Sequence, residues 1–272
     1  MSGLDVLLFY NSANRAGVTS RIESNGDLLT LREFAPNTFG SWTHIVKVGS
    51  RLLYYSRDNR AGVTQEIEAD GSLRTLREFR PGTFGSWTHI ASDGRRLLYY
   101  SRENRAGVTQ EIDAAGGLRT LKEFAPGSFG SWSHIVSDGR RLLYYSDDNL
   151  AGVTQEIDDA GGLRTLKEFR RGSFGRWTHL VSDGRRLLYY SRENQTGVTQ
   201  EIRGTGDLET LQEFKPGAFG VWTHLVSDRR RLLYYSRDSH AGVTQEIDGL
   251  GDLRTLKEFS PGVFGSWTHI TG

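Results

Sequence analysis

The sequence contains no cysteine, and its 272 residues include one methionine and five prolines. Without cysteine it has neither disulfides nor thiol chemistry, and the redox compartment cannot be inferred. Neither sign of charge is in excess, because 34 Lys and Arg stand against 33 Asp and Glu. Nucleic acids and acidic membranes select a basic surplus or stripe, so we expect neither as the main partner.

Long apolar runs are also missing, and none approaches the roughly 20 residues that span a bilayer. The first six residues lack a basic segment followed by a long apolar stretch, so no signal peptide is visible. We therefore expect a soluble protein without membrane insertion, cytoplasmic by default, with non-classical release left open.

The sequence does contain an internal repeat of 45 residues, which occurs six times. Tryptophan recurs at exactly this interval, and six copies fill all but two residues of the chain. A fixed period of about 20–50 residues is typical of solenoids, propellers and arrays. We therefore predict one domain over residues 1–272.

Each copy holds four short runs with strand chemistry. In one copy they cover residues 132–137, 140–146, 153–157 and 163–169, and turn residues such as Asp138-Gly139 separate them. Helical periodicity never persists for the 10 to 12 residues that a helix would need. Four antiparallel strands in about 40–50 residues are typical of a propeller blade. The predicted fold is all-β, a six-bladed β-propeller of four-stranded antiparallel blades.

The two ends of the chain favour a closed ring. It begins inside the second strand of a unit, at residues 7–10, and stops just after a first strand, at residues 267–270. The C-terminal strand can thus complete the N-terminal blade and hide two sheet edges. We predict a closed, monomeric propeller whose Leu, Tyr, Phe and Trp columns fill the space between blades.

The order of motifs resembles that of the tachylectin-2-like β-propeller lectins. The resemblance is carried by the Phe-Gly-Ser-Trp step, as at residues 39–42, and by the Gly-x-x-Leu-Leu-Tyr-Tyr that follows. It implies one small pocket at each blade junction for N-acetylated sugars, and multivalent binding of surface glycans. The type member of that family has five blades, whereas this sequence predicts six.

Two other propeller families share parts of the pattern. The order of the Leu-Tyr-Tyr and Thr-Gln-Glu-Ile motifs is similar to that in the six-bladed fucose lectins of the Aleuria type. The pockets of those lectins use an Arg, a Glu and an aromatic residue. Leu52 and Leu97 occupy the place of the Arg, and the residues that match the Glu are Glu66, Glu111, Glu156, Glu201 and Glu246. The Ser-Asp-Gly-Arg-Arg-Leu-Leu-Tyr-Tyr-Ser run resembles the repeats of TolB-type propellers, which bind protein or peptide.

The main candidate site combines a tryptophan with a histidine two residues later. On a strand these two side chains would share one face, where an indole can stack on a sugar ring and an imidazole can bond its hydroxyls. The alternative is that Trp anchors the blade interface while His ties a neighbouring backbone. The candidates are Trp42, His44, Trp87, His89, Trp132, His134, Trp177, His179, Trp222, His224, Trp267 and His269.

A second candidate column lies in the loop after the second strand. Asparagine bonds sugar hydroxyls well, yet it is also a favoured turn residue. These residues are Asn14, Asn59, Asn104, Asn149 and Asn194. A ring of six histidines could instead hold a metal around the axis, but blade side chains point mainly at neighbouring blades, so we predict no metal and no cofactor.

The repeat also bears on chemistry, because catalysis needs different groups converging on one substrate. Six near-equal blades provide no such singular place, so we do not predict an enzyme. We predict a multivalent carbohydrate-binding protein, a lectin, for N-acetylated sugars or fucose. The alternative from a different class is a symmetric scaffold or protein-interaction propeller, natural or designed, that has no small ligand.

Overall fold

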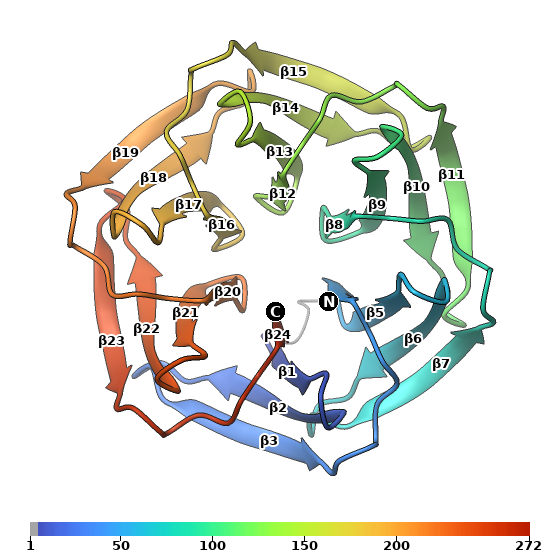
Figure 1. The fold of residues 1–272 in the computed structure, drawn as a ribbon, viewed down its shortest axis with the longest axis horizontal. Coiled ribbons are helices and arrows are strands. Elements are labelled where there is room, and N and C mark those ends of the chain that lie inside the picture. The colour runs from blue at the N-terminus through green and yellow to red at the C-terminus, as the bar shows by residue number, and fades with distance from the viewer. Residues whose placement is uncertain (1–4) are drawn as a thin grey trace.

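Six four-stranded antiparallel sheets surround a central axis in the computed structural model, which describes residues 5–272 (Figure 1). Each sheet is one blade, with its first strand nearest the axis and its fourth at the rim. Residues 5–272 contain no helix, and therefore none that is long and apolar enough to cross a membrane. The predicted six-bladed all-β propeller is confirmed.

The blades follow one another in chain order around the ring. Written from the axis outward they are blade 1, β24 (His269–Thr271), β1 (Leu7–Asn11), β2 (Ala16–Ile22) and β3 (Leu28–Phe34); blade 2, β4 (His44–Val48), β5 (Arg51–Ser56), β6 (Ala61–Ile67) and β7 (Leu73–Phe79); blade 3, β8 (His89–Ser92), β9 (Arg96–Ser101), β10 (Ala106–Ile112) and β11 (Leu118–Phe124); blade 4, β12 (His134–Ser137), β13 (Arg141–Ser146), β14 (Ala151–Ile157) and β15 (Leu163–Phe169); blade 5, β16 (His179–Ser182), β17 (Arg186–Ser191), β18 (Thr196–Ile202) and β19 (Leu208–Phe214); blade 6, β20 (His224–Ser227), β21 (Arg231–Ser236), β22 (Ala241–Ile247) and β23 (Leu253–Phe259).

Blade 1 is assembled from both ends of the chain. The C-terminal strand β24 pairs antiparallel with β1, and the register joins Tyr10 to His269 and Leu8 to Thr271. Strands β1 and β24, which come from opposite ends of the described chain, accordingly lie side by side near the axis (Figure 1). Closure of the ring by the last strand is confirmed.

The first strand of each blade is shorter than predicted. In blade 4 it begins at His134 rather than at residue 132, so Trp132 lies in the linker between blades 3 and 4. The reason is a tertiary hydrogen bond, because Trp132 N donates to the hydroxyl of Tyr100 in blade 3 (3.0 Å) instead of joining the sheet of blade 4. The third strand, in contrast, begins two residues earlier than predicted, at Ala151.

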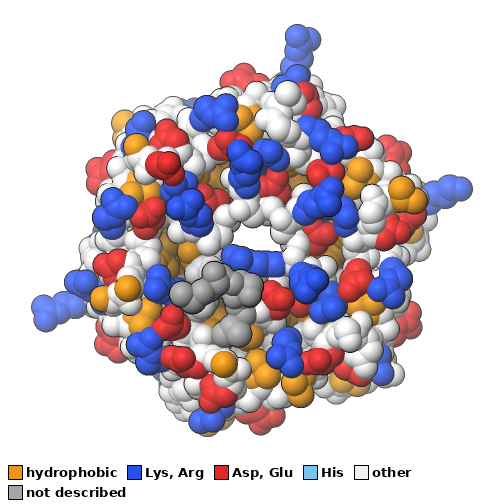
Figure 2. Space-filling view, turned by 180° about the vertical axis from the view of Figure 1, so that it is seen from behind, with side chains coloured by type: hydrophobic (Ala, Val, Ile, Leu, Met, Phe, Trp, Pro, Cys, Tyr) orange, Lys and Arg blue, Asp and Glu red, His pale blue; other side chains and the backbone are white. Residues whose placement is uncertain are grey.

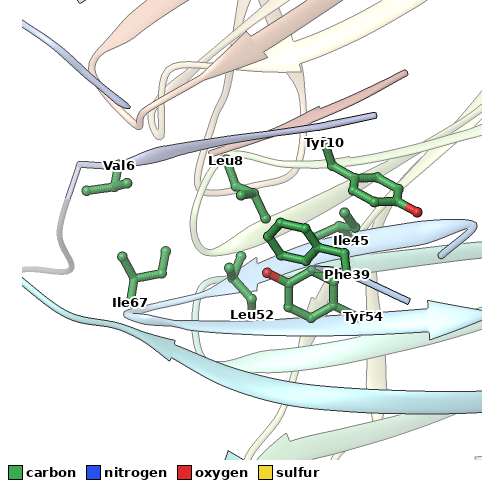
Figure 3. Packing of buried hydrophobic residues seen from close by; sticks show 8 residues of the cluster. All are labelled: Val6, Leu8, Tyr10, Phe39, Ile45, Leu52, Tyr54 and Ile67. Atoms are coloured by element: carbon green, nitrogen blue, oxygen red, sulfur yellow. The ribbon is translucent and has the colours of Figure 1, made fainter. Parts of the chain in front are cut away.

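The core lies between blades rather than inside one. The Leu-Leu-Tyr-Tyr strands are buried on both faces, and alternate side chains face opposite neighbours. At the junction of blades 1 and 2, Leu8 and Tyr10 meet Leu52 and Tyr54, with Phe39 of the linker between them (Figure 3). One apolar cluster of this kind occurs at each junction.

A buried threonine on the third strand connects each blade to the next. Thr154 Oγ1, on β14, donates to the carbonyl of Gly206 in the following blade (2.8 Å). Gly206 has a φ of +88°, and a Cβ there would lie only 2.6 Å from Thr154 Oγ1, so both its backbone and the contact require glycine. The same bond forms at all six junctions, with lengths of 2.7–2.8 Å.

Replacing Thr154 by Val is expected to destabilise the protein. The variant keeps the side-chain shape but leaves a buried carbonyl without its donor, which costs about 1–3 kcal/mol. Urea unfolding followed by tryptophan fluorescence should show a lower midpoint. Thr154→Ser retains the hydroxyl and serves as the control; an unchanged midpoint in Thr154→Val would contradict the role given to this bond.

Candidate functional site

An open hollow lies at the junction of blades 1 and 2, between the inter-blade linker and the outer strands of blade 2. It has a volume of about 380 Å³ and is bounded by Trp42 of the linker and by Tyr54, Gln65, Thr75 and Glu78 of blade 2. Equivalent hollows occur at the junction of blades 3 and 4, with about 380 Å³, and at the closing junction of blades 6 and 1, with about 280 Å³. The hollow is therefore a repeated feature of the propeller.

The indole forms one wall of each hollow and is held in a fixed position. Trp132 is half-buried, and its ring centroid lies 5.8 Å from that of Tyr144. The hydroxyl of Tyr100 accepts from Trp132 N and donates to the carbonyl of Gly130 (2.8 Å). A Cβ on Gly130 would lie 2.7 Å from the indole, so only glycine lets the linker fold against it.

An unpaired carboxylate stands at the rim. In blade 4, Glu168 is exposed and forms no ion pair or hydrogen bond with the described part of the chain. Thr165, three residues earlier on the same strand β15, accepts a hydrogen bond from Gln155 Nε2 of the adjacent strand β14 (2.9 Å). The rim thus presents an acceptor of hydrogen bonds beside an aromatic face.

Two polar atoms are covered in the walls of the hollow without a partner. They are the hydroxyl of Tyr144 and Oε1 of Gln155, neither of which has a hydrogen-bond partner among residues 5–272. Burial raises the pKa of Tyr144 well above its ordinary value, so the hydroxyl stays protonated. Leaving such a group unpaired costs about 1–3 kcal/mol, which makes this pair unusual in a framework position.

The expected Trp and His pair does not share one face, and that expectation is wrong. Trp132 packs on Tyr144, whereas His134 packs on Tyr145, with centroids 5.6 Å apart. Consecutive residues of a strand point to opposite faces, so the two rings lie on opposite sides of blade 4. The cause is the late start of β12, which leaves Trp132 outside the strand.

The histidines contact the backbone of the next blade. His134 Nε2 lies 3.2 Å from the carbonyl of Thr178, and its Nδ1 lies 3.2 Å from Ser133 Oγ. A carbonyl only accepts, so Nε2 carries the proton. The same contact, at 2.9–3.2 Å, links each blade to the next, including His224 to the carbonyl of Thr268 across the closing junction. This geometry matches the alternative in which His ties a neighbouring backbone.

The axial channel is lined by other residues than the histidines. Its mouth has a volume of about 420 Å³ and is bordered by Ser92, Ser137, Ser182, Ser227 and Arg229, among others. Figure 2 shows basic and acidic side chains mixed over the surrounding face. Within residues 5–272, no group of three or more His, Asp or Glu is placed to hold a metal ion.

The asparagine column lies in exposed turns, and its members do not border the three hollows. Asn149 Oδ1 accepts from Ala151 N (3.1 Å), and the same bond forms at Asn14, Asn59 and Asn104. At Asn194 the backbone carbonyl accepts from Gly217 N (3.2 Å). The residue after each of these asparagines has a φ of 51–58°, so the column shapes a left-handed turn.

The glutamate that matches the Aleuria pattern also lies elsewhere. Glu156 alternates with Gln155 and so points to the other face of blade 4, where it accepts from Arg164 (2.5 Å). Sequence reasoning missed the Tyr144, Gln155 and Glu168 columns. The signal was present in strand alternation, which puts Gln155 on the same face as Val153 and Ile157.

Neither a protein family model nor a curated protein sequence matches the chain. Solved structures do: a chain of a nidogen/laminin complex has a TM-score of 0.61 at 14% identity, covering 98% of this chain and 97% of its own. A periplasmic gluconolactonase from Pseudomonas aeruginosa scores 0.57 at 15%, with 97% and 98% covered. A protein from Lactobacillus plantarum scores 0.56 at 16%, with 98% and 84% covered. At such identities the likeness establishes the propeller fold.

Acidification is expected to destabilise the ring through its histidines. Burial lowers the pKa of all six below the ordinary value of 6.5, so the unfolded chain binds more protons than the folded one as pH falls below that value. Stability present above pH 6.5 is therefore lost as the pH falls through the folded pKa values. Thermal unfolding at pH 7.5, 6.5 and 5.5 measures this.

The control replaces His134 and His179 by Gln, which keeps a donor for the neighbouring carbonyl. This variant should lose less stability between pH 7.5 and 5.5 than the parent protein. Equal melting temperatures of the parent at these pH values would contradict the assignment.

Proposed function

We propose that the protein is a multivalent carbohydrate-binding protein whose sites are the hollows at the blade junctions. The observation that carries this proposal is the repeated placement of a half-buried indole opposite an unpaired carboxylate. At the junction of blades 3 and 4 these groups are Trp132 and Glu168. The resemblance to propeller lectins, with a sugar pocket at each blade junction, agrees with this location.

Sugar chemistry fits the two kinds of wall. A pyranose has an apolar face that stacks on an indole and an edge of hydroxyl groups that donate to a carboxylate. The volumes, about 280–380 Å³, lie at the small end of ligand pockets. Small-molecule sites usually span about 300–1,000 Å³, so a terminal monosaccharide is the unit we expect each hollow to take.

Repetition compensates for a shallow site. A single open hollow binds weakly, but several sites on one rigid ring can engage a glycan-bearing surface together, which raises avidity by about 10²–10⁴. Fucose and the N-acetylhexosamines, which belong to the two sugar classes that we predict, are uncharged. A glycan array separates these two classes and would be silent for a scaffold that has no small ligand.

The rim carboxylates provide the test. Replacing them by Ala in all six copies should abolish glycan-array binding and agglutination of erythrocytes, because each lost charge-assisted bond is worth about 1.5–3 kcal/mol. The fold should persist, since these side chains are exposed at the rim and their truncation opens no cavity. The positions are Glu33, Glu78, Glu123, Glu168, Glu213 and Glu258.

The matched control changes the preceding residue of each copy to Ala, which points to the opposite face of the same strand. These positions are Arg32, Arg77, Lys122, Lys167, Gln212 and Lys257. The control should bind as the parent does. The proposed sites would be rejected if the parent protein bound no glycan on the array, or if the glutamate variant bound as well as the parent.

A further inference from the structure

One of the six junctions differs from the others in the walls of its hollow. At five junctions the first tyrosine of the Leu-Tyr-Tyr strand and the glutamine of the following strand bury two unpartnered polar atoms. At the closing junction, the corresponding residues of blade 1 are Phe9 and Ser20. The five pairs are Tyr54 with Gln65, Tyr99 with Gln110, Tyr144 with Gln155, Tyr189 with Gln200, and Tyr234 with Gln245.

The rest of the closing hollow keeps the repeated pattern. Trp267, Thr30 and Glu33 stand where Trp132, Thr165 and Glu168 stand at the junction of blades 3 and 4. The tyrosine hydroxyl and the amide are gone, Val263 replaces Ser128 in the linker, and the volume is about 280 Å³ instead of about 380 Å³. The closing hollow is therefore a natural variant of the hollows at the junctions of blades 1 and 2 and of blades 3 and 4, and it lacks the polar pair that occurs at the five other junctions.

The buried and unpartnered polar pair lowers the stability of the fold. Each buried and unpaired group destabilises the fold by about 1–3 kcal/mol, and apolar replacements of similar shape are close to neutral. Phe9 shows that this fold accepts the ring without its hydroxyl, since Phe9 is 2% exposed in the same core. A ligand hydroxyl entering the hollow would supply the missing partner for the pair.

We propose that the protein has five equivalent binding sites, and that the sixth hollow, at the closing junction, is silent. This inference rests on the proposed function and deepens it. The tyrosine and glutamine pair is the element that decides occupancy, by meeting a hydroxyl group that reaches the inner wall while the indole and the rim carboxylate hold the sugar outside.

The same groups define the chemical class of the ligand. Tyr144 offers a neutral hydroxyl, whereas Gln155 Oε1 and Glu168 are acceptors. No Lys or Arg borders the described hollows. A carboxylated or sulfated sugar would meet the glutamate with like charge, so we assign the five sites to uncharged sugars that present at least two hydroxyl or amide N–H donors.

Each hollow contains one tryptophan, which allows occupancy to be counted junction by junction. In the ¹H–¹⁵N spectrum of the full chain, six indole N–H signals are expected, assigned by single Trp→Phe substitutions. The probes are the methyl glycosides of N-acetylglucosamine, fucose and galactose, with N-acetylneuraminic acid as the anionic probe. Five indole signals should shift with at least one neutral probe, and that of Trp267 should not.

Two double variants test the cause in opposite directions. Phe9→Tyr with Ser20→Gln installs the pair in the closing hollow, where Thr30 is already present to accept from the new amide, and should make the Trp267 signal respond. Tyr144→Phe with Gln155→Ser gives blade 4 the two residues that replace the pair in the closing hollow, leaves Ser128 unchanged, and should silence Trp132 alone. Both variants use residues that already occur at the equivalent position of this fold.

The outcomes separate this inference from the proposed function. If no indole signal responds to any of the sugars, the proposed function fails and the five-site inference with it. If six signals, or any number other than five, respond in the parent protein, the sites bind sugar but the inference is overturned. It is also overturned if Trp267 stays unresponsive after the pair is installed, or if the anionic sugar binds as well as the neutral ones.

Discussion

The hydroxyl of the buried threonine on each third strand, bonded to a glycine carbonyl of the next blade, is the contact on which the ring depends. It joins sheets whose own ladders stop at their edges, at a depth where water cannot replace the bond. Histidine contacts repeat the connection nearer the axis, and the apolar clusters fill the space between. Because β24 completes blade 1, this set of contacts also spans the closing junction, and every blade has two bonded neighbours.

The two tyrosines of the second strand in blades 2 to 6 illustrate how one short motif contributes to both the framework and the candidate site. The second one, such as Tyr100, uses its hydroxyl twice, to accept from the tryptophan backbone and to donate to a glycine carbonyl, and so fixes the linker. The first one, such as Tyr144, points to the other face, where it packs on the indole and buries an unpartnered hydroxyl. Strand alternation alone assigns these roles. The candidate site therefore combines strand residues of one blade with an indole from the linker, and Tyr100 of the preceding blade holds that linker in place.

The 45-residue period, the strand chemistry and the positions of the chain ends were sufficient to predict the fold, because each reflects local pattern or simple counting. The face of Trp132 was not predictable in the same way. It depends on a hydrogen bond to Tyr100, 32 residues earlier and in another blade, which shortens the first strand. Gln155 was accessible to sequence reasoning, since alternation places a polar residue on an apolar face there. The asparagines and histidines were drawn from residue types that suit sugars, and their backbone partners emerged only from tertiary structure.

Near-identity of the junctions has a consequence for assembly of the molecule. Each blade presents the same threonine, histidine and aromatic surface to the next blade. The interface therefore does not select one blade over another as its neighbour. Only the short linkers enforce the order of blades around the axis. When two unfolded chains meet at high concentration, a blade of one can complete the partial ring of the other, with intermolecular versions of the same bonds. Refolding at low protein concentration therefore favours closure within one chain, because the interfaces themselves do not discriminate against a blade from another chain.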